Sequence, residues 1–344
     1  MAKRRAVTMT QVATQAGVSQ ATVSLVLNGA DGGRVSEDTR KRVKDAVEQL
    51  GYRTNAFAKS LRSGHSGMIG FISDEVASAP FAGELLKGAQ QFAWETGNVL
   101  LSVDAYDDAE LEAAAVDMML SYRVSGVIYA SMYHRHVDVP KSLEALPSVV
   151  VNAQDPTGRF SSVFPDEVGG GYAATRHLLD AGHHRIAMIN IQPEDSDLPA
   201  GVGRLEGYRR ALEEKGLVLD PALVAYGSGI VADGFELTSR LMAAAEPPTA
   251  IFCGNDRTAW GAYRALEALG KRPGRDIAIV GFDNHDMLAP NLDPALTTVA
   301  LPYEQMARQA LQILLDGPGS EVRRVAVECT LVERESVMNA KVQR

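Results

Sequence analysis

The chain has 344 residues, of which 46% are hydrophobic and 22% are charged, as is typical of a globular protein. It contains no apolar run long enough to span a membrane, and no apolar segment follows the basic N-terminus, so we expect a cytoplasmic protein without a membrane segment or secretory signal. The two cysteines, Cys253 and Cys329, lie in apolar runs and are expected to be buried, with no disulfide and no metal bound.

Charge is divided unevenly along the chain. Residues 1–64 carry 11 Lys and Arg against 5 Asp and Glu, whereas the whole chain carries 34 against 43. A basic N-terminal segment on an acidic remainder is typical of a protein in which one domain meets phosphate groups. We therefore expect double-stranded DNA as a partner of the N-terminal segment.

Three short helices are predicted near the N-terminus, each beginning at a Ser or Thr that can cap it and ending at Gly or at Asn-Gly. The first two are joined by a tight glycine turn, as in a helix-turn-helix whose second helix enters the major groove. A plain three-helix bundle is the alternative. The capping residues are Thr8, Ser19 and Ser36, and the helices end at Gly17, Asn28-Gly29 and Gly51.

After Gly64, short apolar runs such as GMIGFIS, SGVIYA, TAIFCGN and DIAIVGFDN alternate with amphipathic stretches such as GELLKGAQQFAWETG. Apolar strands that alternate with helices form parallel sheets covered on both faces. Two such sets predict two doubly wound α/β lobes. Because ligands bind at the carboxyl ends of the strands in such lobes, a cleft between the two lobes is the expected ligand site.

Several segments in one order resemble the lactose-repressor family of bacterial transcription regulators: AGVSQATVSLVLNG, VSEDTRKRV and GYRTNAFAKSL, then GNDRTAWGAYRAL and IVGFDN far downstream. The resemblance covers about residues 7–338. It implies an all-α helix-turn-helix head over 1–54, a hinge helix over 55–64 and a periplasmic-binding-protein-like core over 65–340. On the family pattern, lobe one takes about 65–163 and 292–322, and lobe two takes about 164–291 and 323–340, with crossings near 161–165, 290–297 and 321–324.

The resemblance places Gln20, Ala21 and Leu25 at base-reading positions of the second helix. Leu25 departs from the family, in which Arg is common here. A leucine offers only apolar contact and cannot donate to guanine, so the operator sequence cannot be copied from relatives. A place in the core is the alternative for Leu25. The other residues expected to contact DNA or to position the helices are Thr8, Ser19, Thr22, Ser24, Asn28, Arg34, Ser36, Thr39 and Tyr52.

The segment NAFAKSLR, residues 55–62, is a short helical stretch with Asn55 as its cap, and such a helix is marginal alone because nucleation is costly. The resemblance makes it a hinge helix that orders on specific DNA and pairs with that of a second subunit. Leu61 would then be a wedge in the minor groove, with Ala58 beside it. A linker whose leucine packs on the core is the alternative.

Candidate ligand-binding residues follow the predicted strands of the core. Carboxylates that accept from vicinal hydroxyls and an arginine that donates in pairs suit a polyhydroxylated ligand. The resemblance implies that Asp74, Arg204, Asn255 and Asp283 line the effector site. The alternative for Asp and Asn is that they form turns and cap helices. The full expected set is Asp74, Phe81, Asn152, Arg204, Asn255, Asp283 and Tyr303.

Neither a dinucleotide fingerprint nor metal-ligand spacing nor a catalytic constellation occurs in the sequence, so we expect no cofactor, no metal and no enzymatic activity. The resulting hypothesis is a homodimeric repressor of genes for sugar uptake or catabolism, released from a pseudo-palindromic operator by a small carbohydrate. A nucleobase or another non-sugar effector is the first alternative. A solute-binding protein is the second.

Overall fold

The computed structural model describes residues 7–27, 32–52, 66–76, 83–317 and 321–340. The chain divides into two compact units, Met1–Ser66 and Gly67–Arg344, close to the predicted start of the core at residue 65. The predicted hinge helix over 55–64 lies outside the described residues. So do five of the predicted site residues, namely Asn28, Asn55, Ala58, Leu61 and Phe81.

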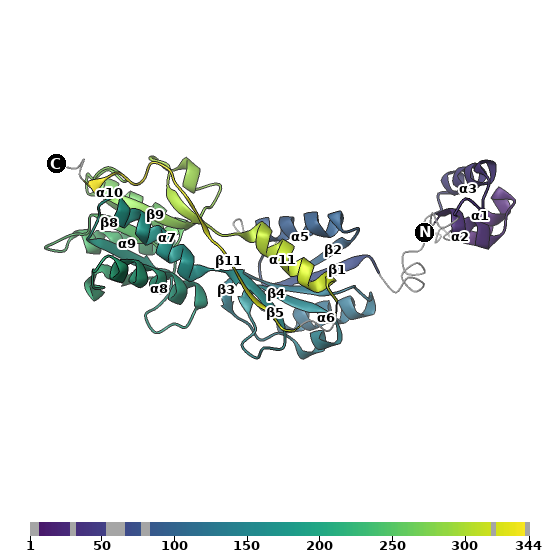
Figure 1. Ribbon diagram of the computed structural model, residues 1–344, viewed down its shortest axis with the longest axis horizontal. Helices are drawn as coiled ribbons and strands as arrows, with labels where there is room; N and C mark the ends of the chain where they lie inside the picture. Colours follow the sequence, from purple (N-terminus) through teal and green to yellow (C-terminus); the bar gives the residue numbers. More distant parts are fainter. Residues whose placement is uncertain (1–6, 28–31, 53–65, 77–82, 318–320, 341–344) are drawn as a thin grey trace. The chain divides into compact units, whose positions relative to one another are not determined.

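The described residues of the first unit form the three predicted helices, which are confirmed: α1 (Met9–Ala16), α2 (Gln20–Leu27) and α3 (Glu37–Leu50) (Figure 1). The Thr8 hydroxyl accepts from the backbone of Gln11, whose side chain in turn accepts from the Thr8 N–H. Gly17 ends α1 with a φ of 63°, a left-handed conformation that glycine adopts without strain. One apolar cluster joins the three helices, and its buried members are Val12, Ala13, Ala16, Val23, Val26, Val43 and Ala46.

Lobe one of the second unit is a parallel six-stranded sheet in the order β11-β5-β4-β3-β1-β2. Helices α5 and α11 share one apolar cluster with the sheet, and α6 belongs to another. The strands are β1 (Met68–Ser73), β2 (Val99–Asp104), β3 (Val127–His136), β4 (Ser148–Gln154), β5 (Ser161–Pro165) and β11 (Arg324–Val327). The helices are α5 (Gly83–Glu95), α6 (Ala109–Ser121), the short η1 (Lys141–Ala145) and α11 (Tyr303–Leu315).

Lobe two has a second six-stranded sheet in the order β12-β10-β9-β8-β6-β7, in which only β12 is antiparallel to its neighbour among the described strands. Helices α7 and α8 share one apolar cluster, and α9 and α10 share another. The strands are β6 (Ile186–Asn190), β7 (Val224–Tyr226), β8 (Ala250–Cys253), β9 (Ala278–Asp283), β10 (Thr297–Ala300) and β12 (Thr330–Val332). The helices are α7 (Glu167–Asp180), α8 (Pro199–Glu214), η2 (Pro221–Leu223), α9 (Val231–Met242), α10 (Asp256–Ala268) and η3 (Ala289–Asn291).

The chain crosses between the lobes three times, but two of the predicted crossing points were wrong. Strand β10 pairs with β9, so the second crossing follows residue 300 and does not lie near 290–297. Strand β11 pairs with β5, so the third crossing follows residue 327 and does not lie near 321–324. Both strands are only four residues long, and their hydrogen-bonded partners decide which sheet each of them extends.

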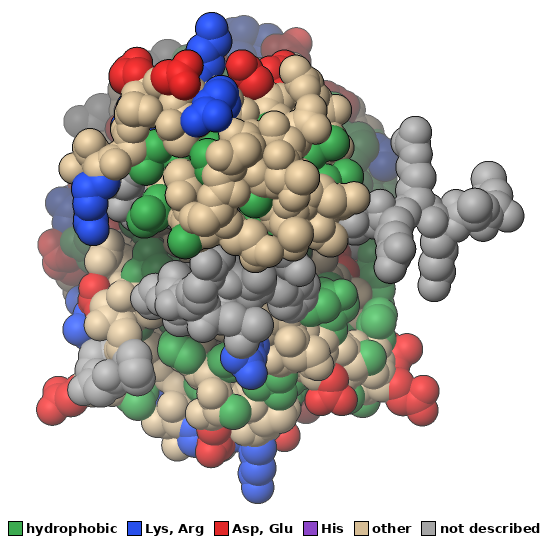
Figure 2. All heavy atoms as spheres, turned by 90° about the vertical axis from the view of Figure 1, so that its right-hand side faces the viewer, with side chains coloured by type: hydrophobic (Ala, Val, Ile, Leu, Met, Phe, Trp, Pro, Cys, Tyr) green, Lys and Arg blue, Asp and Glu red, His purple; other side chains and the backbone are tan. Residues whose placement is uncertain are grey.

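Two lobes built from parallel strands and helices confirm the predicted fold class. Both cysteines are buried, as expected. None of the described helices is long and apolar enough to cross a membrane. On the face drawn in Figure 2, Lys and Arg side chains lie among Asp and Glu side chains, around a broad area of uncharged polar side chains and backbone.

Candidate functional site

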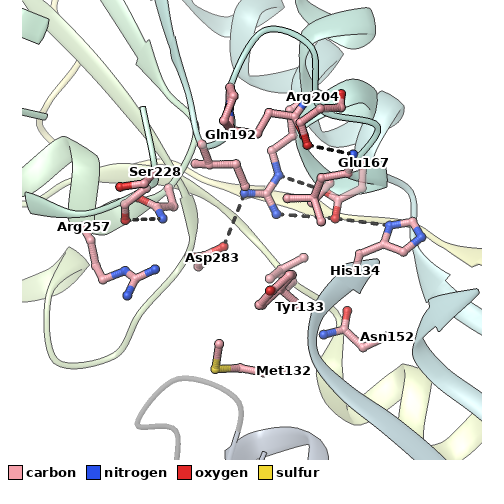
Figure 3. Close-up of a pocket in the computed structure, with 18 of the residues that line it drawn as sticks. Met132, Tyr133, His134, Asn152, Glu167, Gln192, Arg204, Ser228, Arg257 and Asp283 are labelled. Carbon is pink, nitrogen blue, oxygen red and sulfur yellow. Dashed lines mark hydrogen bonds and ion pairs between the residues drawn. The ribbon is translucent and has the colours of Figure 1, made fainter. Parts of the chain in front are cut away.

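A cavity of about 400 Å³ lies between the two lobes, and we call it the interlobe cavity (Figure 3). Lobe one contributes side chains from the carboxyl-terminal parts of β3 and β4. Lobe two contributes residues at or just after the ends of β6, β8 and β9, together with α8. The carboxyl ends of both sheets therefore meet at this cavity, as expected for doubly wound lobes.

The structure brings five of the predicted effector residues together on the walls of this cavity: Asn152, Arg204, Asn255, Asp283 and Tyr303. Sequence reasoning missed the polar lining residues His134, Glu167, Gln192, Ser228 and Arg257. Glu167 is the second residue after β5, a position near a strand end that could have revealed it. An acidic pair at the start of a helix, however, is also an ordinary favourable contact with the helix dipole.

Helices α7 and α8 cross in close contact because glycines face each other. A Cβ atom on Gly171 would lie 2.3 Å from the Arg204 carbonyl oxygen, and one on Gly207 would lie 2.2 Å from that of Val168. Any side chain at either glycine would push the helices apart. This packing holds Arg204, on α8, directly beside Glu167 on the first turn of α7.

Arg204 is 3% exposed, and its guanidinium forms hydrogen bonds to the protein through all three nitrogens. Its Nε atom donates to the Glu167 carboxylate at 2.8 Å, and Nη1 donates to the Gly254 carbonyl oxygen at 2.5 Å. The guanidinium also lies 3.8 Å from the centroid of the Phe282 ring. A buried, multiply bonded arginine of this kind is a fixed donor group, oriented before any ligand arrives.

Asp283 ends β9 with a φ of 110°, a backbone conformation that L-residues rarely adopt. Its carboxylate lies 3.7 Å from Arg204 Nη1, beyond hydrogen-bonding distance, and accepts no hydrogen bond from the described residues. Burial raises the pKa of Asp283 to about 6, against the opposing effect of Arg204. Asp283 therefore offers the cavity a carboxylate whose acceptor sites are open.

Asn152, from lobe one, carries a second acceptor that no described residue satisfies. It has a φ of 53°, and its Nδ2 atom donates to the Ser131 carbonyl oxygen at 3.0 Å. Its Oδ1 atom is buried without a hydrogen-bond partner among the described residues. An unpaired buried acceptor costs free energy, which a ligand hydroxyl or N–H would recover.

Asn255 lines the cavity, and it also caps a helix. Its Oδ1 atom accepts from the Thr258 N–H at 2.8 Å, and its Nδ2 atom donates to the Gly229 carbonyl oxygen at 2.9 Å. It is thus the cap of α10 and a brace for the loop before α9. Asn255 shapes the wall of the cavity with both polar groups already occupied.

Asp74 was expected to line the effector site, and the structure places it elsewhere. Among the described residues it faces a separate cavity of about 170 Å³, with Asp107, Glu112 and Arg135. Its carboxylate accepts from the Met132 N–H at 2.8 Å, in a segment where the pairing of β3 with β4 shifts register. Asp74 thus supports the strand that forms the lobe-one wall without lining the interlobe cavity.

In the first unit, Ser19 caps α2, because its Oγ accepts from the Thr22 N–H at 3.1 Å. The Gln20 side chain is exposed and donates to the Thr10 hydroxyl at 2.8 Å. Leu25 is half-buried but does not belong to the apolar cluster of the head, whereas Tyr52 packs against that cluster. Of the other predicted DNA-contacting residues, Thr8, Ser19, Ala21, Arg34 and Ser36 are exposed, and Thr22, Ser24 and Thr39 are half-buried.

Two family models match the chain. Residues 8–55 match bacterial regulatory proteins of the lacI family, and residues 175–337 match the periplasmic binding protein-like domain. The HTH-type transcriptional repressor PurR of Erwinia tasmaniensis is 34% identical over 338 residues, which cover 96% of each chain.

Two solved structures extend the comparison. The complex of the transcriptional regulator CelR with cellobiose is 31% identical, covers 96% of this chain and 99% of its own, and superposes with a TM-score of 0.67. The lac repressor dimer bound to operator and an anti-inducer is 27% identical, covers 97% and 100%, and has a TM-score of 0.79. With similarity of this kind along nearly its whole length, the chain belongs to the lacI family of bacterial regulatory proteins, and it is a DNA-binding transcriptional regulator rather than an enzyme.

Proposed function

We propose that the chain represses genes for carbohydrate uptake or catabolism, binds a pseudo-palindromic operator as a homodimer and is released when a small neutral carbohydrate fills the interlobe cavity. The observation that carries this proposal is the pair of acceptors on Asp283 and Asn152, which line that cavity from different lobes and accept no hydrogen bond from the described residues. A ligand that donates hydroxyl protons to both acceptors contacts both lobes at once. Its binding therefore favours one arrangement of the lobes over others.

The chemistry of the cavity supports a polyhydroxylated ligand. Sugars donate and accept through vicinal hydroxyls, which suits a carboxylate, an amide oxygen and the exposed Ser228. A volume of about 400 Å³ lies within the range of small-molecule sites. A relative of this chain was solved with cellobiose, which makes a disaccharide the first candidate.

On the DNA side, we propose that α2 enters the major groove with Gln20, Ala21 and Leu25 toward the bases. Gln can pair with adenine, and Ala and Leu can touch a thymine methyl group. Two heads in a homodimer would read two half-sites related by a two-fold axis. The predicted hinge residues Asn55, Ala58 and Leu61 belong to this proposal on the basis of the sequence resemblance alone.

Two measurements test the proposal. Gel-shift titration of genomic fragments at low salt should retain a fragment that contains a pseudo-palindrome, and a failure to retain any fragment would contradict DNA binding. Thermal-shift screening should then show a rise in Tm with mono- or disaccharides. A rise with nucleobases alone would instead support the nucleobase alternative.

A further inference from the structure

Arg204 lies between the carboxylates of Glu167 and Asp283 but forms hydrogen bonds only with that of Glu167. Glu167 takes two contacts, at 2.8 Å to Nε and 3.4 Å to Nη2, whereas Asp283 lies at 3.7 Å from Nη1 (Figure 3). Glu167 is buried on the first turn of α7, and Asp283 is partly open to the cavity. The more buried carboxylate therefore forms the hydrogen bonds, and the more exposed one is left without them.

We propose that Glu167 is a positioning residue for effector binding: it takes the hydrogen bonds of Arg204 and thereby keeps the Asp283 carboxylate available to accept from a ligand hydroxyl. This inference rests on the proposed function, because it assigns Asp283 as the ligand acceptor. A buried guanidinium without Glu167 would need another anion, since an uncompensated buried charge is strongly unfavourable. Asp283 is the nearest described carboxylate that could serve.

Glu167 also contacts lobe one. Its Oε1 atom lies 3.5 Å from Nδ1 of His134, a contact between the lobes, and Nδ1 has no hydrogen-bond partner among the described residues. The His134 ring stacks on Phe164 with centroids 5.0 Å apart, and its Nε2 atom lies 2.7 Å from the Gln154 amide nitrogen. Burial alone would raise the pKa of Glu167, but Arg204 and His134 outweigh that effect and lower it, so Glu167 stays ionised.

Several charged or titratable groups surround Asp283. Arg204 on α8 and Glu167 on α7 act on it from one side, and Arg257 and Asp256 act from α10. Tyr303, which begins α11, faces it as well. Replacing Glu167 with glutamine leaves Asp283 as the only carboxylate within 4 Å of Arg204 among the described residues. Asp283 should then close on Arg204 and lose its open acceptor sites.

The test compares wild type with Glu167→Gln in the full chain by ¹³C carboxyl NMR titration, with Asp283→Asn identifying the Asp283 signal. Wild type should give a midpoint near pH 6 for Asp283, and the variant should give a midpoint at least about one pH unit lower. A crystal structure of the variant should show the 3.7 Å separation shortened to hydrogen-bonding distance. An unchanged separation would overturn the proposal.

If Glu167→Gln does not fold, the titration midpoint of Asp283 in the wild-type protein still tests the proposal. A wild-type midpoint below the ordinary aspartate range of about 3.9 would show that Asp283 is already the main partner of Arg204, which contradicts the proposal. The control is Asp180→Asn, which removes an exposed carboxylate from the end of the same helix, where it pairs with Arg176 and Lys215. It should leave the midpoint of Asp283 unchanged.

Measurements of carbohydrate affinity distinguish a failure of this inference from a failure of the proposed function. Isothermal titration with cellobiose and a panel of mono- and disaccharides at pH 7.5 should show about tenfold or greater loss of affinity in Glu167→Gln, although Asp283 is ionised in both proteins at this pH. Binding by wild type with equal affinity in the variant overturns the inference alone. If wild type binds none of the sugars, the proposal of a carbohydrate effector is contradicted. The NMR titration and the crystal structure of the variant still test the role of Glu167.

Discussion

The Oδ2 atom of Asp74 lies 2.9 Å from Nη2 of Arg135 and accepts from the Ser131 hydroxyl at 2.7 Å. Asp74 thus links both ends of the segment 131–135, where β3 departs from its register with β4, and we call this hydrogen-bonded segment the bracket. Within this bracket, Met132, Tyr133 and His134 line the interlobe cavity. The shape of the lobe-one wall therefore depends on a carboxylate outside the cavity.

Asp74→Ala should weaken carbohydrate binding although Asp74 does not line the interlobe cavity. It removes three hydrogen bonds to the bracket, and the free energy of unfolding should fall by about 3 kcal/mol. Chemical denaturation and isothermal titration measure the two effects. Asp107→Asn is the matched control, because Asp107 also pairs with Arg135, at 3.2 Å, from an exposed position. Equal sugar affinity in Asp74→Ala and the control would contradict the role of the bracket.

Carbohydrate binding should weaken in acid. The pKa of Asp283 is raised to about 6 in the folded protein, so its carboxylate accepts hydroxyl protons fully above that pH and loses this capacity below it. Affinity should fall by about tenfold per pH unit below the midpoint. Asp283→Asn should bind weakly with a flat profile between pH 5 and 8. A wild-type profile that is equally flat would exclude Asp283 as the acceptor.

Asp256 should make the protein less stable as the pH rises. It is buried on α10, where burial raises its pKa to about 8, and its carboxylate accepts from the Thr298 hydroxyl at 2.6 Å. Because the folded-state pKa lies above the unfolded one, the stability contribution is full below about pH 4 and is lost as the pH rises through 8. Denaturant titrations of Asp256→Asn should show a weaker decline from pH 5 to 8 than wild type. Parallel declines would contradict this assignment.

Leu25→Ala should weaken operator binding without destabilising the head. Leu25 does not belong to the apolar cluster of the three helices, so its loss should leave the Tm of the head nearly unchanged. Loss of one apolar base contact should cost about 1–3 kcal/mol of binding free energy in a gel-shift titration. Val23→Ala is the control, because Val23 is fully buried and its truncation should lower the Tm. A large drop in Tm for Leu25→Ala would instead place this leucine in the core.

Much of the fold could be predicted because its causes are local. Capping residues and left-handed glycines set the helices of the head, as at Ser36 and Gly51, and the alternation of strands and helices fixed the two lobes. The assignment of β10 and β11 to their sheets could not be predicted. Both are four-residue strands, and hydrogen bonds to strands distant in sequence decide which lobe each one joins.

Part of the candidate site could be predicted, because some of its residues are also recognised from local sequence patterns. Arg204 follows from a family resemblance, Asp283 follows from the resemblance and from its strand-end position, and the structure brings the two together. Asp74 occupies a similar strand-end position, yet its carboxylate is used by the neighbouring strand β3. The role of Glu167 depends on the close contact of α7 with α8, which no local pattern reveals. The contacts that each side chain makes in the folded protein, rather than its residue type, decide whether it lines the cavity.

The central claim is that a carbohydrate in the interlobe cavity, held by Asp283, releases the chain from its operator. The most direct test is fluorescence anisotropy of a labelled genomic fragment that the wild-type chain retains, with the sugar that raises its Tm added in steps. We predict that the sugar releases wild type from the fragment, whereas Asp283→Asn stays bound at the same sugar concentrations. Release of both proteins at equal concentrations would contradict the claim.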